Sequence, residues 1–306
     1  MKPQCPYCQV EESSNRNPDC LIKKVGTFYR SSDRKNVQRY RCARCLRYFS
    51  SSTLTDCYKQ KKRHLNGAIA KHLVTCTSLR ETAWVLGINR KTVARRLIFW
   101  GIRAEKLLVK QTQKLKQQKP ISQIQFDDME SFIHTKCKPV AISLAVQEKS
   151  RYILALEVSE MPAKGLLAKI ALKKYGQRLD QRAQARGKVF SQLQSLVSED
   201  VHIKTDESTH YINDIKNYFP RGTHKTYKGR RGAIVGQGEL KKIAFDPLFS
   251  LNHTAAMARY KVSRLVRRTW CTSKKIERLR DHLYLMAVFH NLRLDLNMQT
   301  KGSVYN

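Results

Sequence analysis

Acidic residues are scarce in this sequence. Its 306 residues include 24 Asp and Glu against 59 Lys and Arg, which gives a formal net charge of +35 at pH 7. Such an excess is far beyond what solubility requires, so it indicates a polyanionic partner. The charge is not confined to a basic tail, because residues 1–63 and 64–120 each carry +10 and the remainder carries +15.

Long apolar runs are also lacking. No stretch approaches the ~20 residues of a membrane span, and the segment from Met1 to Cys5 has no apolar signal region. We therefore expect no membrane partner. The nine cysteines suit a reducing compartment, and five of them have no partner at a ligand-like spacing, so we expect ordinary reduced thiols at Cys20, Cys57, Cys76, Cys137 and Cys271.

The other four cysteines form two C-x-x-C pairs, Cys5-Pro-Tyr-Cys8 and Cys42-Ala-Arg-Cys45. Four thiolates at this spacing can surround one tetrahedral Zn²⁺ in a closed, structural site. Strand-like stretches lie between the pairs, at 24–30 and 37–41. The pattern predicts a zinc ribbon over residues 1–56, and four unrelated thiols or a redox pair are the alternatives.

Residues 64–109 have the pattern of a helix-turn-helix. Ser78-Leu79-Arg80-Glu81 is a capping box, which predicts that a helix begins after Ser78. Its buried face would be supplied by Ala83, Val85 and Leu86.

Gly87-Ile88-Asn89 predicts a short turn, because Gly tolerates a left-handed backbone and Asn caps a following helix. In that second helix Val93 and Leu97, four residues apart, face inward. The outward side chains near its start would be Lys91, Thr92, Arg95 and Arg96. A recognition helix presents such side chains to the DNA major groove, whereas an ordinary helical hairpin with a solvated basic face is the alternative.

Residues 110–120 have little to bury and read as a linker or a solvated helix extension, with Pro120 at a boundary. Beyond it the pattern becomes extended, with strands expected at 121–126, 139–146 and 151–158. A helical region follows at about 162–197, and then a fourth strand over Val201–Glu207. We expect one domain over 121–295 and a tail at 296–306.

Two of these strands end in carboxylates, at Asp127 and at Asp206. Carboxylates held close together repel each other unless a cation lies between them. Sites with two Mg²⁺ ions use such carboxylates for phosphoryl transfer. Acids that merely end strands or cap helices are the alternative.

Taken in order, the ribbon, the helix-turn-helix and a β-β-β-α-β segment with Asp at strand ends resemble the bacterial insertion-sequence transposases with an RNase-H-like DDE domain. Tyr40–Ser50 is similar to the second zinc knuckle of that family, and Phe126–Phe132 and Thr205–Glu207 are similar to its two catalytic strands. Asn252–Thr254 with Arg259, and Arg264–Thr269, are similar to its closing helix. The resemblance covers roughly residues 1–290.

The resemblance implies a multidomain α+β protein: zinc ribbon, helix-turn-helix, then an RNase-H-like α/β domain with a mixed central sheet and flanking helices. It implies that Asp127, rather than the adjacent Asp128, and Asp206 are Mg²⁺ or Mn²⁺ ligands. The third ligand would be Asn252, where the family usually has Glu, and Glu239 and Asp246 are its rivals. Arg259, two helical turns after Asn252, would contact DNA.

Residues 223–232 are basic and rich in Gly, and we read them as a flexible loop that holds DNA phosphates through Lys225, Lys228, Arg230 and Arg231. The predicted function is a transposase that acts on terminal inverted repeats and target DNA as a homodimer or larger assembly in the cytoplasm, on the nucleoid. There are three alternatives. The first is a DNA-binding regulator without catalysis, which includes a decayed copy of a transposase. The others are a nuclease without strand transfer and a structural subunit of a larger complex.

Overall fold

The computed structural model describes residues 3–7, 22–118, 120–228, 246–266 and 271–303. The chain divides into two compact units, Met1–Ala68 and Ile69–Asn306. Among the described residues no helix has both the length and the apolar character needed to cross a membrane.

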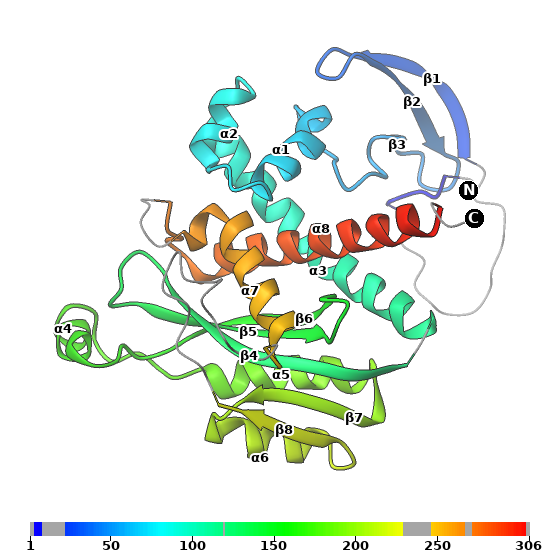
Figure 1. Cartoon of the computed structure of the whole chain (residues 1–306). Coiled ribbons are helices and arrows are strands. Elements are labelled where there is room, and N and C mark those ends of the chain that lie inside the picture. Colours follow the sequence, from blue (N-terminus) through cyan, green and yellow to red (C-terminus); the bar gives the residue numbers. More distant parts are fainter. Residues whose placement is uncertain (1–2, 8–21, 119, 229–245, 267–270, 304–306) are drawn as a thin grey trace. The chain divides into compact units, whose positions relative to one another are not determined.

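The first unit contains a three-stranded antiparallel sheet in the order β1-β2-β3 (Figure 1). Its strands are β1 (Ile22–Arg30), β2 (Lys35–Cys42) and β3 (Tyr48–Ser50). The strand-like stretches expected from the sequence are confirmed, since they lie within β1 and β2. Most side chains of β1 are exposed, whereas Val37, Cys42 and Phe49 are buried.

The next elements are α1 (Asn66–Leu73), α2 (Leu79–Val85) and α3 (Arg90–Gln118). The predicted helix start after Ser78 is confirmed, because Ser78 is the N-cap and its Oγ accepts from the Glu81 backbone N–H at 3.1 Å. The turn before α3 is as expected as well: Gly87 has φ +58° and the Lys91 N–H donates to Asn89 Oδ1 at 2.8 Å. The prediction that Val85 is buried is wrong, since this residue is 53% exposed.

Residues 110–118 continue α3, so this segment is a helix extension and not an extended linker. It is also not solvated throughout. Thr112 is buried, Gln111 Nε2 donates to the Val288 carbonyl, and Lys116 Nζ donates to the Ser195 carbonyl at 2.8 Å. The polar composition of residues 110–118 did not indicate these contacts, because only a few positions on one helix face make them.

The second unit is built on a five-stranded mixed sheet in the order β6-β5-β4-β7-β8. Its strands are β4 (Ile121–Phe132), β5 (Pro139–Gln147), β6 (Ile153–Glu160), β7 (Val197–Asp206) and β8 (Thr223–Tyr227). The first three form the expected antiparallel meander, and β7 and β8 run parallel to β4. This mixed sheet with its flanking helices is compatible with an RNase-H-like domain.

Helices cover both faces of this sheet (Figure 1). The remaining ones are α4 (Leu166–Tyr175), α5 (Arg182–Gln194), α6 (Thr209–Tyr218), α7 (Phe249–Lys261) and α8 (Ile276–Ser303). On one face Phe126 packs with Phe190 of α5 and Tyr211 of α6 in the main apolar core. On the other face lie α7 and α8, and α8 packs in turn on α3.

Candidate functional site

Asp127 and Asp206 lie side by side on two neighbouring parallel strands. Asp206 is the last residue of β7, but Asp127 lies in the middle of β4. The prediction that the strand ends at Asp127 is therefore wrong, because pairing with β5 extends β4 as far as Phe132. In the ladder between β4 and β7, Gln125 pairs with Lys204. Two residues further along each strand the register reaches Asp127 and Asp206, and a step of two returns each side chain to the same face of the sheet. The pKa of Asp127 is raised to about 6, first by burial and then by the negative charge of Asp206. The fold therefore places these two carboxylates close together in a partly buried site.

Backbone and hydroxyl donors orient both carboxylates. Asp127 Oδ1 accepts hydrogen bonds from the Asp128 N–H at 2.7 Å and from the Tyr211 hydroxyl at 3.2 Å. Asp206 Oδ1 accepts one from the Ser208 N–H at 3.1 Å. Within the described part of the chain, no hydrogen bond is made to Oδ2 of either residue. Each carboxylate thus has one oxygen that accepts no hydrogen bond from the described residues.

Tyr211 is a site residue that sequence reasoning missed. Its side chain is buried, and burial and the neighbouring carboxylates raise the pKa of its hydroxyl, which keeps that group a hydrogen-bond donor. The same oxygen accepts from the Asp128 N–H at 3.1 Å. The only signal in the sequence was its place in the helix that follows Asp206, and this did not distinguish it from an ordinary core tyrosine.

Asp128 faces away from Asp206. Its carboxylate accepts from the Ser143 hydroxyl and lies 3.3 Å from Arg186 Nη1, on the face covered by α5. Arg186 also pairs with Asp214 of α6 at 2.6 Å. Because Asp128 is neutralised in this structural network, the geometry favours Asp127 as the acid that is available for a cation.

The start of α7 is held over the sheet by Gln125, which lies on the same face of β4 as Asp127. Gln125 Nε2 donates to the Pro247 carbonyl, and the Leu251 N–H donates to Gln125 Oε1, both at 2.9 Å. These two bonds bring the predicted third ligand region to the face that carries the carboxylate pair. Sequence reasoning did not single out Gln125.

The candidates for the third ligand are bonded to each other. Asn252 is exposed on α7, and its Nδ2 donates to Asp246 Oδ2 at 2.8 Å, while Asp246 Oδ1 accepts from the Leu248 N–H. Glu239 lies outside the described residues. The oxygens of two carboxylates and one amide or third carboxylate are the donor set that a hard divalent cation prefers.

The first unit holds a separate cluster of thiols. The sulfur atoms of Cys5, Cys42 and Cys45 all lie within 4.8 Å of one another, and this group could hold a metal ion. Cys5 Sγ and Cys45 Sγ are 3.7 Å apart. Cys8, the fourth predicted ligand, lies outside the described residues.

The basic side chains at the start of α3 do not all face outward. Lys91 and Arg95 are exposed and Thr92 is half-buried, in keeping with the expected orientation. Arg96 is a correction, since it is only 8% exposed. Arg96 lies three residues after the buried Val93 and directly before the buried Leu97, so helical spacing places it on the buried face of α3 despite its charge.

The expected phosphate-binding loop is also partly corrected. Thr223–Tyr227 form β8, an edge strand paired with β7, so Lys225 is held in a sheet and not in a flexible loop. Lys225 and Lys228 are exposed. Arg230 and Arg231 lie outside the described residues. The parallel pairing was hidden from sequence reasoning because strand partners come from distant parts of the chain.

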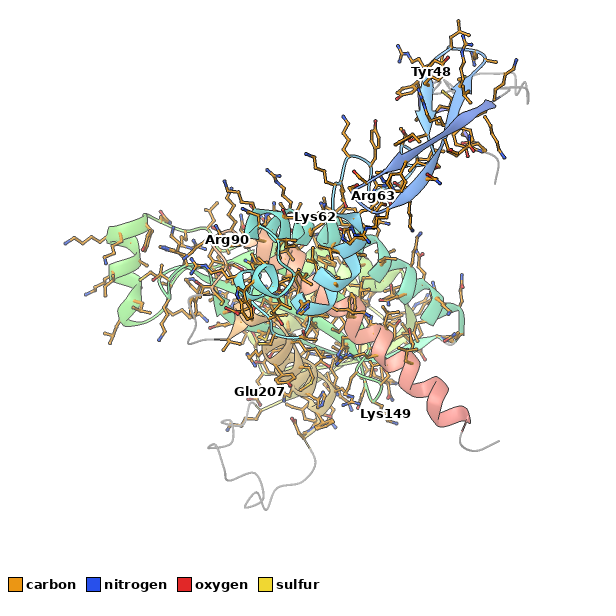
Figure 2. All side chains as sticks on the ribbon, turned by 90° about the horizontal axis from the view of Figure 1, so that it is seen from above. Tyr48, Lys62, Arg63, Arg90, Lys149 and Glu207 are labelled. Atoms are coloured by element: carbon orange, nitrogen blue, oxygen red, sulfur yellow. The ribbon has the colours of Figure 1, made fainter. Side chains whose placement is uncertain are left out.

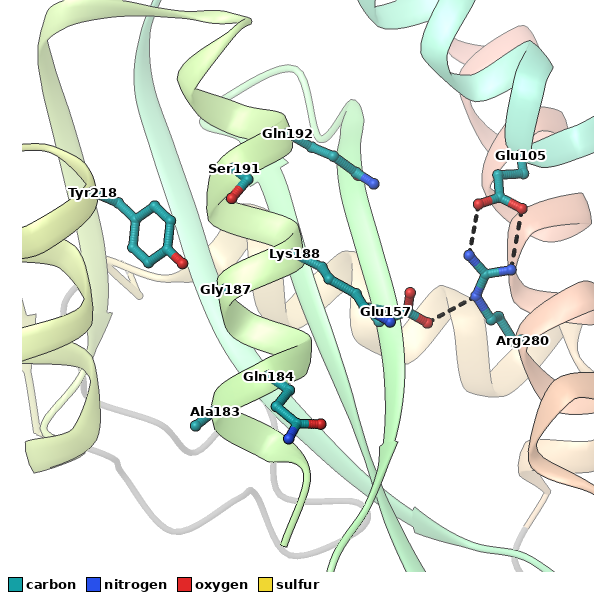
Figure 3. Close-up of a pocket in the computed structure, with 10 residues that line it drawn as sticks. All are labelled: Glu105, Glu157, Ala183, Gln184, Gly187, Lys188, Ser191, Gln192, Tyr218 and Arg280. Carbon is teal, nitrogen blue, oxygen red and sulfur yellow. Dashed lines mark hydrogen bonds and ion pairs between the residues drawn. The ribbon is translucent and has the colours of Figure 1, made fainter.

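A cavity of about 720 Å³ lies away from the carboxylate pair, among residues of α3, α5, β6 and α8. Its wall contains an ion-pair network in which Arg280 binds Glu105 at 2.6 Å and Glu157 at 2.8 Å (Figure 3). None of the predicted ligands lines this cavity. Arg280 pairs with both acids of this wall, so we assign the network to the packing of α3, α8 and β6.

No family model matches this chain, and no curated protein matches it in sequence. Among solved structures, one similar chain belongs to the crystal structure of the Mos1 strand transfer complex. The two chains are 10% identical, the match covers 79% of each, and the TM-score is 0.24. A likeness this distant carries no conclusion about the present chain.

Proposed function

We propose that this protein is a DDE-type DNA transposase that binds the terminal inverted repeats of a mobile element and catalyses metal-dependent strand cleavage and strand transfer. The observation that carries the proposal is the carboxylate pair on adjacent parallel strands, Asp127 in the middle of β4 and Asp206 at the end of β7. The net charge of +35 supports a nucleic-acid substrate. DNA breakage and joining require no covalent cofactor, so a cation site on a basic protein is sufficient.

In this proposal Asp127 and Asp206 hold Mg²⁺ or Mn²⁺, with Asn252 as the third ligand. Two such ions, when bound, would activate the attacking oxygen and stabilise the leaving one. Tyr211 and the Asp128 N–H fix the orientation of Asp127, and the Ser208 N–H fixes that of Asp206. Burial and, after it, repulsion from Asp206 raise the pKa of Asp127, and the repulsion supports a cation site because a cation would relieve it.

The proposal assigns Zn²⁺ to the cysteine cluster, with Cys5, Cys8, Cys42 and Cys45 as its ligands. Tetrahedral Zn²⁺ with Zn–S bonds of about 2.3 Å places neighbouring sulfurs about 3.8 Å apart. The Cys5–Cys45 separation of 3.7 Å supports this assignment, and it is far longer than the ~2.05 Å of a disulfide. The metal would hold a zinc ribbon together.

DNA recognition is assigned to α2 and α3 as a helix-turn-helix. The cap at Ser78, the turn at Gly87 and the exposed Lys91 and Arg95 support it. Further phosphate contacts are assigned to Thr92, Lys225, Lys228, Arg230, Arg231 and Arg259. Since two element ends must be cut and joined, we propose a homodimer or larger assembly on the DNA.

A regulator that binds DNA without cutting it is the second candidate. It is favoured by the neutral amide of Asn252, which would hold a divalent cation less strongly than the Glu usual at this position in the resembled family. The same observation would fit an inactive copy of a transposase.

The test incubates the purified protein with duplexes that carry the terminal repeats, with Mg²⁺ or Mn²⁺, beside Asp206→Asn. Asp200→Asn, which alters an exposed acid on the same strand, is the matched control. Cleavage and joining that are lost only in Asp206→Asn, with DNA binding retained, would support the transposase. Cutting without joining indicates a nuclease, and binding without cutting indicates the regulator.

The third ligand is tested in the same assay with Asn252→Ala and Asp246→Asn. If Asn252 holds the cation, its variant requires more Mn²⁺ for half-maximal cleavage than the unmodified protein. A larger effect of Asp246→Asn would move the assignment to Asp246.

A further inference from the structure

A basic groove lies between the paired helices α2 and α3 and the segment that leads into α8. It has a volume of about 810 Å³, and six cationic side chains line it: Arg80, Arg90, Arg264, Lys274, Lys275 and Arg278. Glu81 is the only acidic residue among the described residues that line it. Arg80, Arg90, Lys274 and Lys275 are exposed (Arg90 is labelled in Figure 2).

Little of this positive charge is neutralised by the protein. Among the six cations, within the described part of the chain, only Arg278 forms an ion pair, with Asp281 at 2.6 Å. Arg264 Nη1 donates to the hydroxyl of the buried Ser273 at 2.9 Å. Burial lowers the pKa of Arg264, whereas the nearby Cys271 and Asp281 act in the opposite direction. Arg80, Arg90, Lys274 and Lys275 are therefore the exposed cations of the groove that form no ion pair within the described part of the chain.

The position of the groove points to one kind of anion. Arg90 is the first residue of α3, and Arg80 lies in the first turn of α2. When the second helix of such a pair enters the major groove, the first crosses the sugar–phosphate backbone. Backbone phosphates then pass the start of both helices, which is where one wall of this groove lies. The opposite wall, at Lys274 and Lys275, belongs to the segment that leads into α8.

We propose that this groove holds the sugar–phosphate backbone of the double-stranded DNA whose bases α3 contacts. The inference rests on the proposed DNA-binding function and adds a surface to it. Both walls would hold one stretch of duplex, one wall coming from the recognition helices and the other from the C-terminal part of the sheet domain. Such contacts position DNA but carry no sequence information.

The test removes two charges from the second wall with Lys274→Gln/Lys275→Gln. The matched control, Lys173→Gln/Lys174→Gln, removes two charges from exposed positions on α4. The Kd is measured by fluorescence anisotropy over a series of KCl concentrations, for a terminal-repeat duplex, an unrelated duplex and a single-stranded oligonucleotide. Arg80→Gln provides an independent change in the first wall.

Loss of two phosphate contacts should reduce the slope of log K against log[salt] by about 1.8, which corresponds to about 30-fold weaker binding at 0.15 M salt. Arg80→Gln should reduce the slope by about 0.9. Both duplexes should lose affinity by the same factor, the control pair should keep its slope, and thermal melting should be unchanged in all variants.

An unchanged slope in both groove variants, with the unmodified protein binding duplex normally, would overturn the groove and leave the proposed function standing. Equal losses in the α4 control would also overturn it, since the effect would then come from net charge alone. A loss confined to the single-stranded oligonucleotide would overturn the duplex assignment. If the unmodified protein binds no DNA, both the proposed function and the groove fail.

Discussion

The buried apolar side chains of the first unit are Val37, Cys42 and Phe49 among its described residues, whereas the second unit buries a continuous core around Phe126, Phe190 and their neighbours. A buried apolar side chain contributes about 1.5–3 kcal/mol. Ordering the backbone costs about 1–2 kcal/mol per residue, and the strands of the first unit have nine, eight and three residues.

Three buried side chains are too few to offset that cost, so the first sheet needs another source of stability. The cysteine cluster supplies one if it binds a metal, because a metal that binds only the folded form adds its binding free energy to folding. The second unit has no such need. On the proposed zinc assignment the first sheet would be held by a metal and the second by its core, so the two units should fail under different conditions.

The largest effect is expected from Cys42→Ser. Removing one thiolate should abolish metal binding, worth about 10–16 kcal/mol in small zinc domains, and unfold β1–β3 while the second unit keeps its melting temperature. Metal content by mass spectrometry and limited proteolysis of the first unit are the measurements. Cys57→Ser, which changes a thiol of the same unit outside the cluster, is the control. A metal-loaded, protease-resistant Cys42→Ser protein would contradict the assignment.

The converse change is Phe190→Ala in the second unit. Phe190 is completely buried and packs 4.7 Å from Phe126, measured between ring centroids. Its truncation should destabilise the second unit by about 3–5 kcal/mol through lost burial and a cavity, and leave the metal content of the first unit unchanged. Chemical denaturation measures the change. Leu179→Ala, at a position that is 70% exposed, should cost less than about 0.5 kcal/mol.

Acid should weaken the second unit through two buried histidines. Burial lowers the pKa of His282 to about 3 and that of His290 to about 4. Each is neutral when folded, and its Nε2 bonds a carbonyl, that of Leu73 or Arg151. Since the unfolded chain takes up protons near pH 6.5, this stability is complete above that pH and is lost as the pH falls toward 4. The loss by pH 5 is about 2 kcal/mol per histidine.

His290→Gln tests this pH dependence, because glutamine keeps a donor for the Arg151 carbonyl but does not titrate. The unfolding free energy of the variant should fall less steeply between pH 6.5 and 5 than that of the unmodified protein. Asp127, whose pKa is raised to about 6, is present in both and so does not distinguish them. His210→Gln, at an exposed position, should leave the slope unchanged. Arg151 and Lys261 lie near His290, and their positive charges act in the same direction as burial. Equal slopes for all three proteins would refute the prediction.

Local chemistry made much of this fold predictable. The capping box at Ser78 and the turn at Gly87 depend on neighbouring residues, so they could be read directly. The meander of β4, β5 and β6 followed from alternation and short turns. The acids at Asp127 and Asp206 stood out because acids are scarce, and the four strands that were expected are present in the expected order along the chain.

Contacts between distant segments could not be read in this way. The parallel pairing of β8 with β7, the Gln125 bonds to α7 and the hydroxyl of Tyr211 at Asp127 all join parts of the chain far apart in sequence. The burial of Arg96 is different, because its spacing from Val93 already placed it on the buried face and its charge concealed this. A neighbouring carboxylate can likewise be neutralised from another helix, as Arg186 does for Asp128, which no local pattern reveals.

The smallest effect is expected from Ser78→Ala, which removes the cap of α2 without touching either core. Loss of the bond from the Glu81 N–H should cost about 1 kcal/mol and lower the melting temperature of the second unit by about 2–4 °C, as calorimetry would measure. Ser78→Asp restores an acceptor and should recover the stability, while Ser122→Ala, at an exposed position of β4, should have no effect.

Because α2 packs on α3, a loss confined to α2 would weaken DNA binding before it unfolds the sheet. Ser78→Ala with unchanged melting and unchanged affinity would show that α3 is held in place by α8 rather than by its helical partner.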